Sequence, residues 1–183
     1  MHGFERGTLL IEEETCKQGL ASLIGCTPPI DAAITYNFGF GDHDFNLSAA
    51  GSWVDKIDFF FDPSDPEAID PELGEVGRPE WSGRASLGYS NGPFKFGYSV
   101  QYLSEMGLGD VEIETAEAQF GDVGIADEYF IHDISASYSF MDDRFEVYGG
   151  VSNLTDENPF VTERAYPVNP VGRYFYLGLR FSM

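Results

Sequence analysis

The feature that most constrains this chain is a strict two-residue alternation in its last stretch. One set of positions is apolar: Phe175, Leu177, Leu179, Phe181 and Met183. The positions between them are Tyr174, Tyr176, Gly178, Arg180 and Ser182. Because successive side chains of a strand point to opposite faces, this pattern predicts a β-strand with one apolar face. Its length and its two faces suit a strand that crosses a bilayer as part of a barrel.

The same alternation recurs upstream and predicts further strands at residues 30–38, 44–53, 81–90, 94–102, 130–140 and 144–151, which makes seven in all. Taken over all the strands, the face opposite the apolar set is rich in Gly, Ser and Ala. A soluble sheet would more often show Lys, Glu and Thr to water. The composition therefore favours an apolar face toward lipid. Since alternation alone does not say which face is inside, a soluble β-barrel that binds an apolar ligand stays open as an alternative.

The connections between these predicted strands alternate between short and long. Short turns are expected at residues 39–43, 91–93 and 141–143, and long acidic segments at 58–78 and 107–128, followed by a last long loop at 153–170. Pro63, Pro66 and Pro71 are expected to keep the first long segment out of any sheet. The fold class is therefore all-β, an antiparallel up-and-down meander of a membrane barrel with short periplasmic turns and long extracellular loops.

Two motifs flank the last long loop. The first is Gly149–Pro159, with the sequence GGVSNLTDENP, and the second is Val171–Phe181, with the sequence VGRYFYLGLRF. As a pair they resemble the closing hairpin of TonB-dependent outer-membrane receptors, in which a G-V-x-N-L-x-D-x-x-P strand end leads into a loop and a G-R strand closes the barrel. The resemblance covers residues 30–183. That family usually ends in Phe, and Met183 departs from this pattern.

The resemblance implies a place in the outer membrane of a Gram-negative bacterium and the import of a scarce ligand, such as a siderophore, cobalamin or an oligosaccharide. The partners that it implies are outer-membrane lipid, the barrel-assembly machinery, a plug domain and the remaining barrel strands. An energy-coupling protein would act only through the plug. The chain would be the C-terminal part of a barrel of about 22 strands, not competent alone. In the alternative, the chain is a complete small eight-stranded barrel with a structural or adhesive role.

The N-terminal part divides the chain at residue 29. Residues 1–29 are expected to be the remnant of an extracellular loop, and residues 30–183 to be the barrel strands. Thr8–Glu14 is a candidate for an eighth strand, although its Leu9-Leu10-Ile11 run does not alternate. Residues 1–20 show no basic segment followed by an apolar one, so no signal peptide is expected there. This favours a piece of a longer precursor.

Charge and hydropathy argue against a nucleic-acid-binding protein and against a protein with a transmembrane helix. The net charge of −21 argues against a nucleic-acid partner, which needs a basic face. No run of roughly 18 apolar residues is present, so no transmembrane helix is expected.

The chain shows no catalytic set and no cofactor motif. Its three histidines are scattered, and His132 is expected on the apolar face of a strand. Cys16 and Cys26 lie in one short polar segment, where a local disulfide is the favoured prediction and two free thiols the alternative. A zinc site is not expected, because two cysteines without nearby His do not make a ligand set. The acidic run from Asp62 to Glu72 offers oxygens for Ca²⁺, but its spacing matches no calcium loop, so no metal site is assigned.

Two further groups of residues have predicted places. Aromatic residues near strand ends are expected to form interfacial belts: Phe38, Trp53, Trp81, Tyr89, Phe94, Tyr102, Phe130, Phe140 and Phe175. Charged residues opposite the apolar set are expected to face the lumen: Arg84, Lys95, Asp133, Arg144, Glu146 and Arg180. By the resemblance, these charges would contact plug or substrate, and Arg164 and Tyr166 are the most exposed loop candidates.

Overall fold

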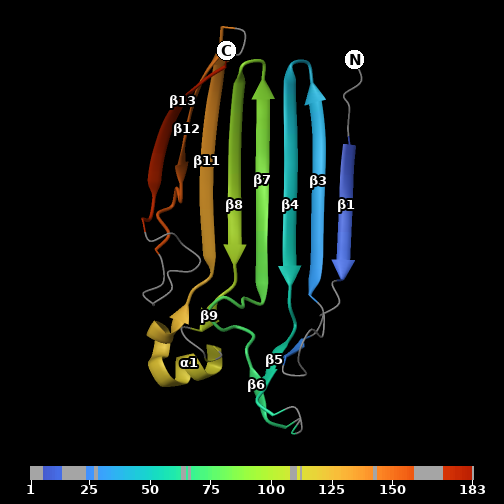
Figure 1. Ribbon diagram of the computed structural model, residues 1–183, viewed down its shortest axis with the longest axis vertical. Coiled ribbons are helices and arrows are strands. Elements are labelled where there is room, and N and C mark those ends of the chain that lie inside the picture. Colours follow the sequence, from blue (N-terminus) through green and yellow to red (C-terminus); the bar gives the residue numbers. More distant parts are fainter. Residues whose placement is uncertain are drawn as a thin grey trace.

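The main sheet is an eight-stranded antiparallel meander (Figure 1). The computed structural model describes residues 6–13, 24–26, 29–62, 65, 67–107, 111, 113–141, 144–158 and 171–182. The strands of the main sheet, in spatial order, are β1 (Arg6–Glu13), β3 (Ile30–Phe40), β4 (His43–Trp53), β7 (Trp81–Asn91), β8 (Phe94–Leu103), β11 (Tyr129–Phe140), β12 (Phe145–Ser152) and β13 (Tyr174–Phe181). In Figure 1 the short turns lie at one end of the sheet and the long connections at the other.

The seven strands expected from alternation are confirmed, with ends that differ by one or two residues. Two of the short turns use glycines in the left-handed region, Gly41 with φ 62° and Gly92 with φ 51°. Glycine reaches this region without steric cost, which is why these tight reversals fall where they do.

The candidate strand at Thr8–Glu14 is confirmed as β1, which begins two residues earlier and ends one residue earlier. β1 pairs with β3 along its whole length, from Arg6 opposite Asn37 to Glu13 opposite Ile30. The unbroken apolar run Leu9-Leu10-Ile11 hid the two-residue period that marks the other strands.

The pairing register gathers the predicted apolar sets on one face of the sheet. Residues that lie directly opposite in antiparallel strands share a face. Two rows show the pattern across β3, β4, β7 and β8: Tyr36, Leu47, Leu87 and Tyr98, then Phe38, Phe45, Tyr89 and Phe96. The pairs Val147↔Leu179 and Val151↔Phe175 continue it across β12 and β13. We call this the apolar face and its opposite the polar face.

The apolar face does not line a dry interior. Ile34 is 49% exposed and Leu177 is 81% exposed, although both lie within strands. In the described part of the chain, the buried apolar side chains lie at the long-connection end: Leu103, Met106, Ala116, Ala126 and Tyr129. The strands therefore do not enclose a hydrophobic core of their own.

The sheet has two free edges. β1 and β13 stand at opposite ends of the strand order, and no ladder among the described residues joins them (Figure 1). The barrel is thus not closed by these strands.

The long connections contain structure that the sequence did not predict. The first carries β5 (Ile57–Phe60) and β6 (Ile69–Pro71), which form a small sheet with β2 (Ile24–Cys26). Pro71 corrects the expectation that prolines stay outside any sheet, since it pairs with Asp58. It ends β6, which lies at the edge of the small sheet, where a missing N–H is tolerated.

The second long connection, expected to be a loop, folds into β9 (Met106–Gly107), α1 (Ile113–Phe120), the 3₁₀ turn η1 (Gly121–Gly124) and β10 (Ile125–Ala126). β9 and β10 pair with each other. None of the helices described has both the length and the apolar character needed to cross a bilayer.

Candidate functional site

Aromatic rings form two belts on the apolar face, one near each end of the strands. At the short-turn end, ring centroids of Phe38 and Phe45 are 4.8 Å apart, those of Phe45 and Tyr89 5.0 Å, and those of Phe145 and Phe181 5.0 Å. We define the turn belt as Phe38, Phe40, Phe45, Tyr89, Phe94, Phe140, Phe145 and Phe181.

The second belt lies at the long-connection end. The rings of Trp53 and Trp81 are 5.8 Å apart, and those of Tyr102 and Phe130 are 5.0 Å apart. We call these four residues the loop belt. The indole N–H of Trp53 donates to Glu80 at 3.0 Å, and that of Trp81 donates to the same carboxylate oxygen at 3.2 Å.

The spacing of the belts suits a membrane. From Phe45 to Trp53 the strand rises by about 26 Å, which is comparable to the apolar band of about 25 Å in outer-membrane barrels. The nine aromatic residues singled out in the sequence lie toward strand ends, as expected; Phe175, at the long-connection end of β13, is 72% exposed.

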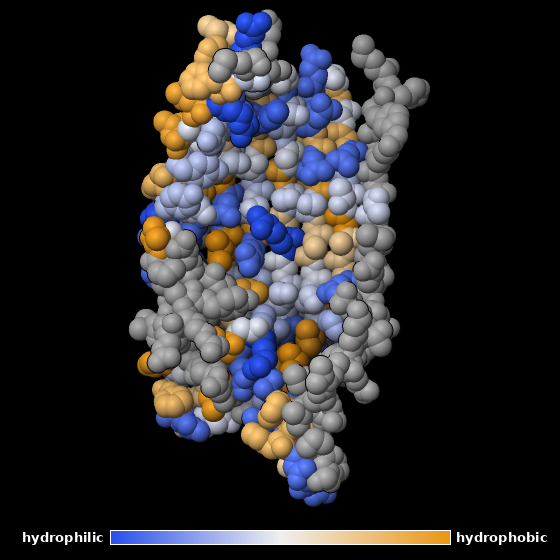
Figure 2. All heavy atoms as spheres, viewed as in Figure 1, coloured by the Kyte–Doolittle hydropathy of each residue, from blue (hydrophilic) through white to orange (hydrophobic). Residues whose placement is uncertain are grey.

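The polar face carries small and hydroxyl-bearing residues in hydrogen-bonded contact, and Figure 2 shows its hydrophilic and pale spheres over the middle strands. The Ser48 and Ser86 hydroxyls are 2.7 Å apart, and an Arg84 Nη donates to Ser99 Oγ at 3.3 Å. An open hollow of about 530 Å³ lies on this face, with Arg84 and Asp133 among its lining residues.

Five of the six charges expected to face the lumen share the polar face by register: Arg84 lies opposite Gln101, Lys95 opposite Ser137, Asp133 opposite Ser99, and Glu146 opposite Arg180. Arg180 Nη1 lies 2.5 Å from Glu146 Oε2, and its guanidinium carbon lies 5.4 Å from the centre of the Tyr148 ring. Arg144 differs from the expectation, because it lies in the turn before β12 and not in the strand.

Two tyrosines of the polar face lie over glycines of the neighbouring strand. A Cβ added at Gly150 would lie 2.5 Å from the Tyr176 hydroxyl and would overlap the carbonyl oxygen of Ile134. A Cβ at Gly178 would likewise meet the ring of Tyr148. Sequence reasoning missed these contacts. The signal was present in the register, where Gly150 lies opposite Tyr176 and Tyr148 opposite Gly178.

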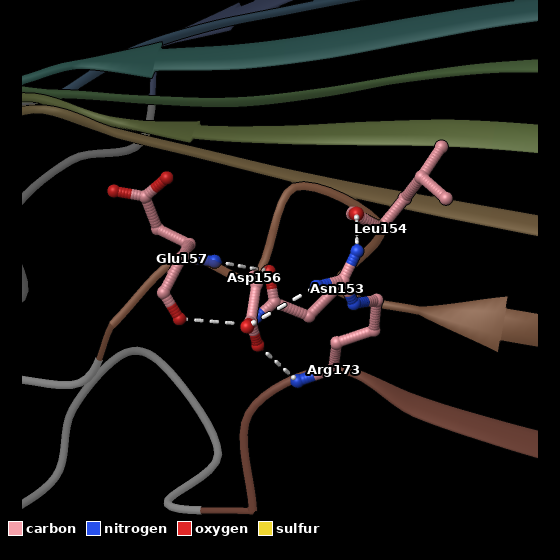
Figure 3. A network of polar contacts seen from close by, with 5 residues as sticks. All are labelled: Asn153, Leu154, Asp156, Glu157 and Arg173. Carbon is pink, nitrogen blue, oxygen red and sulfur yellow. Dashed lines mark hydrogen bonds and ion pairs between the residues drawn. The ribbon is translucent and has the colours of Figure 1, made fainter.

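The two motifs that flank the last long connection meet in one polar network (Figure 3). Asn153 is 5% exposed, and its side chain exchanges two hydrogen bonds with the backbone of Glu157, each 2.8 Å long. The Arg173 backbone N–H donates to Asp156 Oδ1 at 2.9 Å, and its Nη2 donates to Asp156 Oδ2 at 3.3 Å. The sequence predicted that these motifs bracket a loop, but not that their side chains bond to each other.

Two histidines are held by tyrosine hydroxyls. His43 Nδ1 lies 2.8 Å from Tyr89 Oη, and His132 Nδ1 lies 2.7 Å from Tyr98 Oη. His132 lies on the apolar face, as expected, opposite Val100. Among the residues described, no group of three or more His, Cys, Asp or Glu side chains is arranged to hold a metal ion.

Some predictions fall outside the described residues. Cys16, Arg164, Tyr166 and Met183 are among them, so the Cys16–Cys26 disulfide stays a prediction. The backbone of Cys26 pairs with Ile57 in the small sheet.

Comparison with known proteins agrees with this geometry. A family model described as TonB dependent receptor-like, beta-barrel matches residues 30–154 of the 183-residue chain. No curated protein matches the chain. The matched family consists of transporters of the Gram-negative outer membrane and not of enzymes. Because the matched strands span well over half of the chain, this protein belongs to the TonB-dependent receptor family and contributes to its β-barrel.

Proposed function

We propose that this chain is the C-terminal barrel section of an outer-membrane transporter that imports a scarce ligand, such as a ferric siderophore, cobalamin or an oligosaccharide. The energy would be coupled through a plug domain outside these 183 residues. The family match supports this proposal. The observation that carries it is the continuous apolar face, exposed across the strands and bounded by an aromatic belt near each end.

The free edges of β1 and β13 support a section of a larger barrel. Each edge presents backbone N–H and C=O groups that hydrocarbon cannot hydrogen-bond, and each unsatisfied group there costs several kcal/mol. Further strands that cover both edges would remove this cost. With β1 the sheet has eight strands, the number that a complete small barrel needs. That alternative also needs β1 to pair with β13, and these two strands lie at opposite ends of the sheet.

The two faces of the sheet would have different contacts. The apolar face would contact outer-membrane lipid, and the polar face, with Arg84 and the Glu146–Arg180 pair, would contact the plug. The long connections would form the extracellular vestibule. The energy-coupling protein would reach this section only through the plug, and the barrel-assembly machinery would recognise β13.

The lipid contact is testable through fluorescence, because Trp53 and Trp81 are the two tryptophans of the chain. The full-length product of the gene is reconstituted into vesicles of brominated phosphatidylcholine. Any tryptophan other than Trp53 and Trp81 is first replaced by Phe. Bromine near the head-group end of the acyl chains should quench emission more strongly than bromine near the chain ends, since the loop belt lies at an interface. Emission that is the same in brominated and plain lipid would contradict the proposal.

Transport needs a separate test. In a bacterium that carries the complete gene, uptake of the ligand should stop when the energy-coupling protein is removed. Reading the coding sequence upstream of Met1 should show a plug domain and further barrel strands in frame. A stop codon directly upstream, together with uptake that does not change, would favour the small complete barrel.

A further inference from the structure

We infer that Asn153, Asp156 and Arg173 form a clamp that fixes the start of β13 against the end of β12, independently of residues 159–170, which join the two strands along the chain. The clamp would set the register of β13, whatever sequence the connection has. It would act in any membrane barrel built from this chain, so its failure would leave the import proposal untouched.

The first part of the clamp anchors the end of β12 on β11. The ladder between these strands ends at Ile134 opposite Val151. Beyond that pair, Asp133 Oδ1 accepts from Ser152 Oγ at 2.6 Å and from the Asn153 backbone N–H at 3.0 Å. The Leu154 N–H donates to the carbonyl of His132 at 2.7 Å. The chain after β12 is therefore still held on β11 where it turns.

The second part is the turn itself. Asn153 and Asp156 both have left-handed backbones, with φ 53° and φ 60°, a region that Asn and Asp tolerate better than other side chains. The Asp156 N–H donates to the carbonyl of Asn153 at 2.9 Å, and the buried Asn153 amide closes the turn on Glu157. The turn holds the Asp156 carboxylate toward the start of β13, as Figure 3 shows.

The third part comes from β13. Besides its two bonds to Asp156, Arg173 donates from Nη1 to the carbonyl of Leu154 at 3.3 Å. Gly172 precedes it with φ 70°, and a Cβ there would lie 3.1 Å from Asp156 Oδ1. The next residue, Tyr174, begins the ladder opposite Ser152. A slip of β13 by two residues would keep its apolar side chains on the same face but would remove Arg173 from all three acceptors.

This arrangement separates strand register from the connection. Register in a sheet is usually set by the turn that joins two strands and by the face pattern. The apolar positions of β13 repeat along the strand and do not by themselves distinguish a two-residue slip. Within the strands, the Gly150–Tyr176 and Tyr148–Gly178 contacts and the Glu146–Arg180 pair favour the native register, and the clamp fixes it at the start of β13. Because the clamp holds Arg173 directly, the register of β13 should not depend on the sequence of residues 159–170.

The test replaces residues 159–170 with a Gly/Ser linker of equal length or half that length in the full chain with C16S and C26S, with and without D156A. One cysteine pair, Val147→Cys with Leu179→Cys, reports the native register, because these residues are directly opposite. A second pair, Val147→Cys with Leu177→Cys, reports a two-residue slip. The heat-shifted band of a folded barrel on a detergent gel is measured in parallel.

With the clamp intact, both linkers should keep the native cross-link and the folded band. Adding D156A to the linker variants should lower the ratio of native to slipped cross-link, or the folded fraction, by roughly tenfold, as expected for lost charge-assisted hydrogen bonds. R173A should act alike, and D156N, which keeps an acceptor for the Arg173 N–H, should lie between. The inference is overturned if a linker alone shifts the register or abolishes the band, or if D156A and R173A leave both readouts unchanged.

Discussion

The main sheet and the packed segments at its long-connection end are stabilised in different ways. In the sheet, apolar side chains such as Leu47 (40% exposed) and Leu177 (81% exposed) lie open on one face. At the end of the sheet, Leu103, Met106, Ala126 and Tyr129 form a small dry cluster against which Ile131 packs. The first region has a regular ladder without a core, and the second has a core with only a two-residue ladder.

The contrast indicates where each region finds its apolar surroundings. The packed end buries its own side chains, as a water-soluble protein does. The sheet leaves its apolar face to be covered from outside, as a membrane barrel does with lipid. Substitutions should therefore affect the two regions separately, and the following predictions test this separation from the largest expected effect to the smallest.

Met106→Ala should loosen the packed end without unfolding the sheet. Met106 is 0% exposed, and removing a buried Met side chain costs about 2–5 kcal/mol through lost burial and the cavity left behind. Hydrogen exchange of amides in α1 and η1 should rise steeply, while the heat-shifted gel band keeps its midpoint. Val123→Ala is the matched control, since Val123 belongs to the same segment and is 82% exposed. Equal loss of the band and of α1 protection would show that the two regions form one cooperative unit.

Leu47→Arg should destabilise the main sheet and leave the packed end unchanged. Leu47 lies on the apolar face near the middle of β4, where an arginine costs about 2–4 kcal/mol against lipid. Folding into vesicles, followed by urea titration of the gel band, measures the loss. The neighbouring substitution Ser48→Arg puts the same charge on the polar face, where we expect a loss under about 1 kcal/mol, from the Ser48–Ser86 hydrogen bond. Similar losses at both positions would contradict the assignment of the faces.

The same contrast explains what could be predicted from sequence. The seven strands followed from a local signal, since each residue's face depends on the parity of its position. The faces of Leu47 and Ser48 needed no long-range information. Helix α1 gave no comparable signal, because Ile113–Phe120 is a short segment whose place depends on packing Ala116 and its neighbours. Such packing brings together residues distant in sequence, which no local pattern reports.

The network around Asn153 was predicted in part. Its motifs marked the loop boundaries correctly, because Asn, Asp and Gly favour left-handed backbones. The contact between Asp156 and Arg173 was not predicted, since it depends on how β13 returns beside β12.

Gly150→Ala tests whether β12 and β13 are tightly packed against each other within the sheet. A Cβ at Gly150 would meet both the Tyr176 hydroxyl and the carbonyl of Ile134, so moving the ring alone does not make room. We expect a loss of about 1–3 kcal/mol, as for overpacking, read from urea titration of the folded band. Gly88→Ala on the same face is the control, because its Cβ would find no atom closer than 3.6 Å. Equal, small effects at both glycines would show that β12 and β13 adjust freely.

Glu80→Ala should give the smallest change, at the boundary between the two regions. Glu80 ends the connection that returns to β7, and its carboxylate accepts from the indoles of both Trp53 and Trp81. These bonds are exposed, so their loss should cost no more than about 1 kcal/mol. The backbone bond from Val54 N–H to the Glu80 carbonyl, at 3.0 Å, is kept in the variant and limits the damage further. Tryptophan emission should nevertheless shift, because both indoles exchange a carboxylate acceptor for water or lipid head groups.

Glu105→Ala is the control, since Glu105 lines the same hollow as Glu80 but has no indole contact among the described residues. Unchanged emission in Glu80→Ala would show that the Glu80 carboxylate does not set the environment of the two indoles.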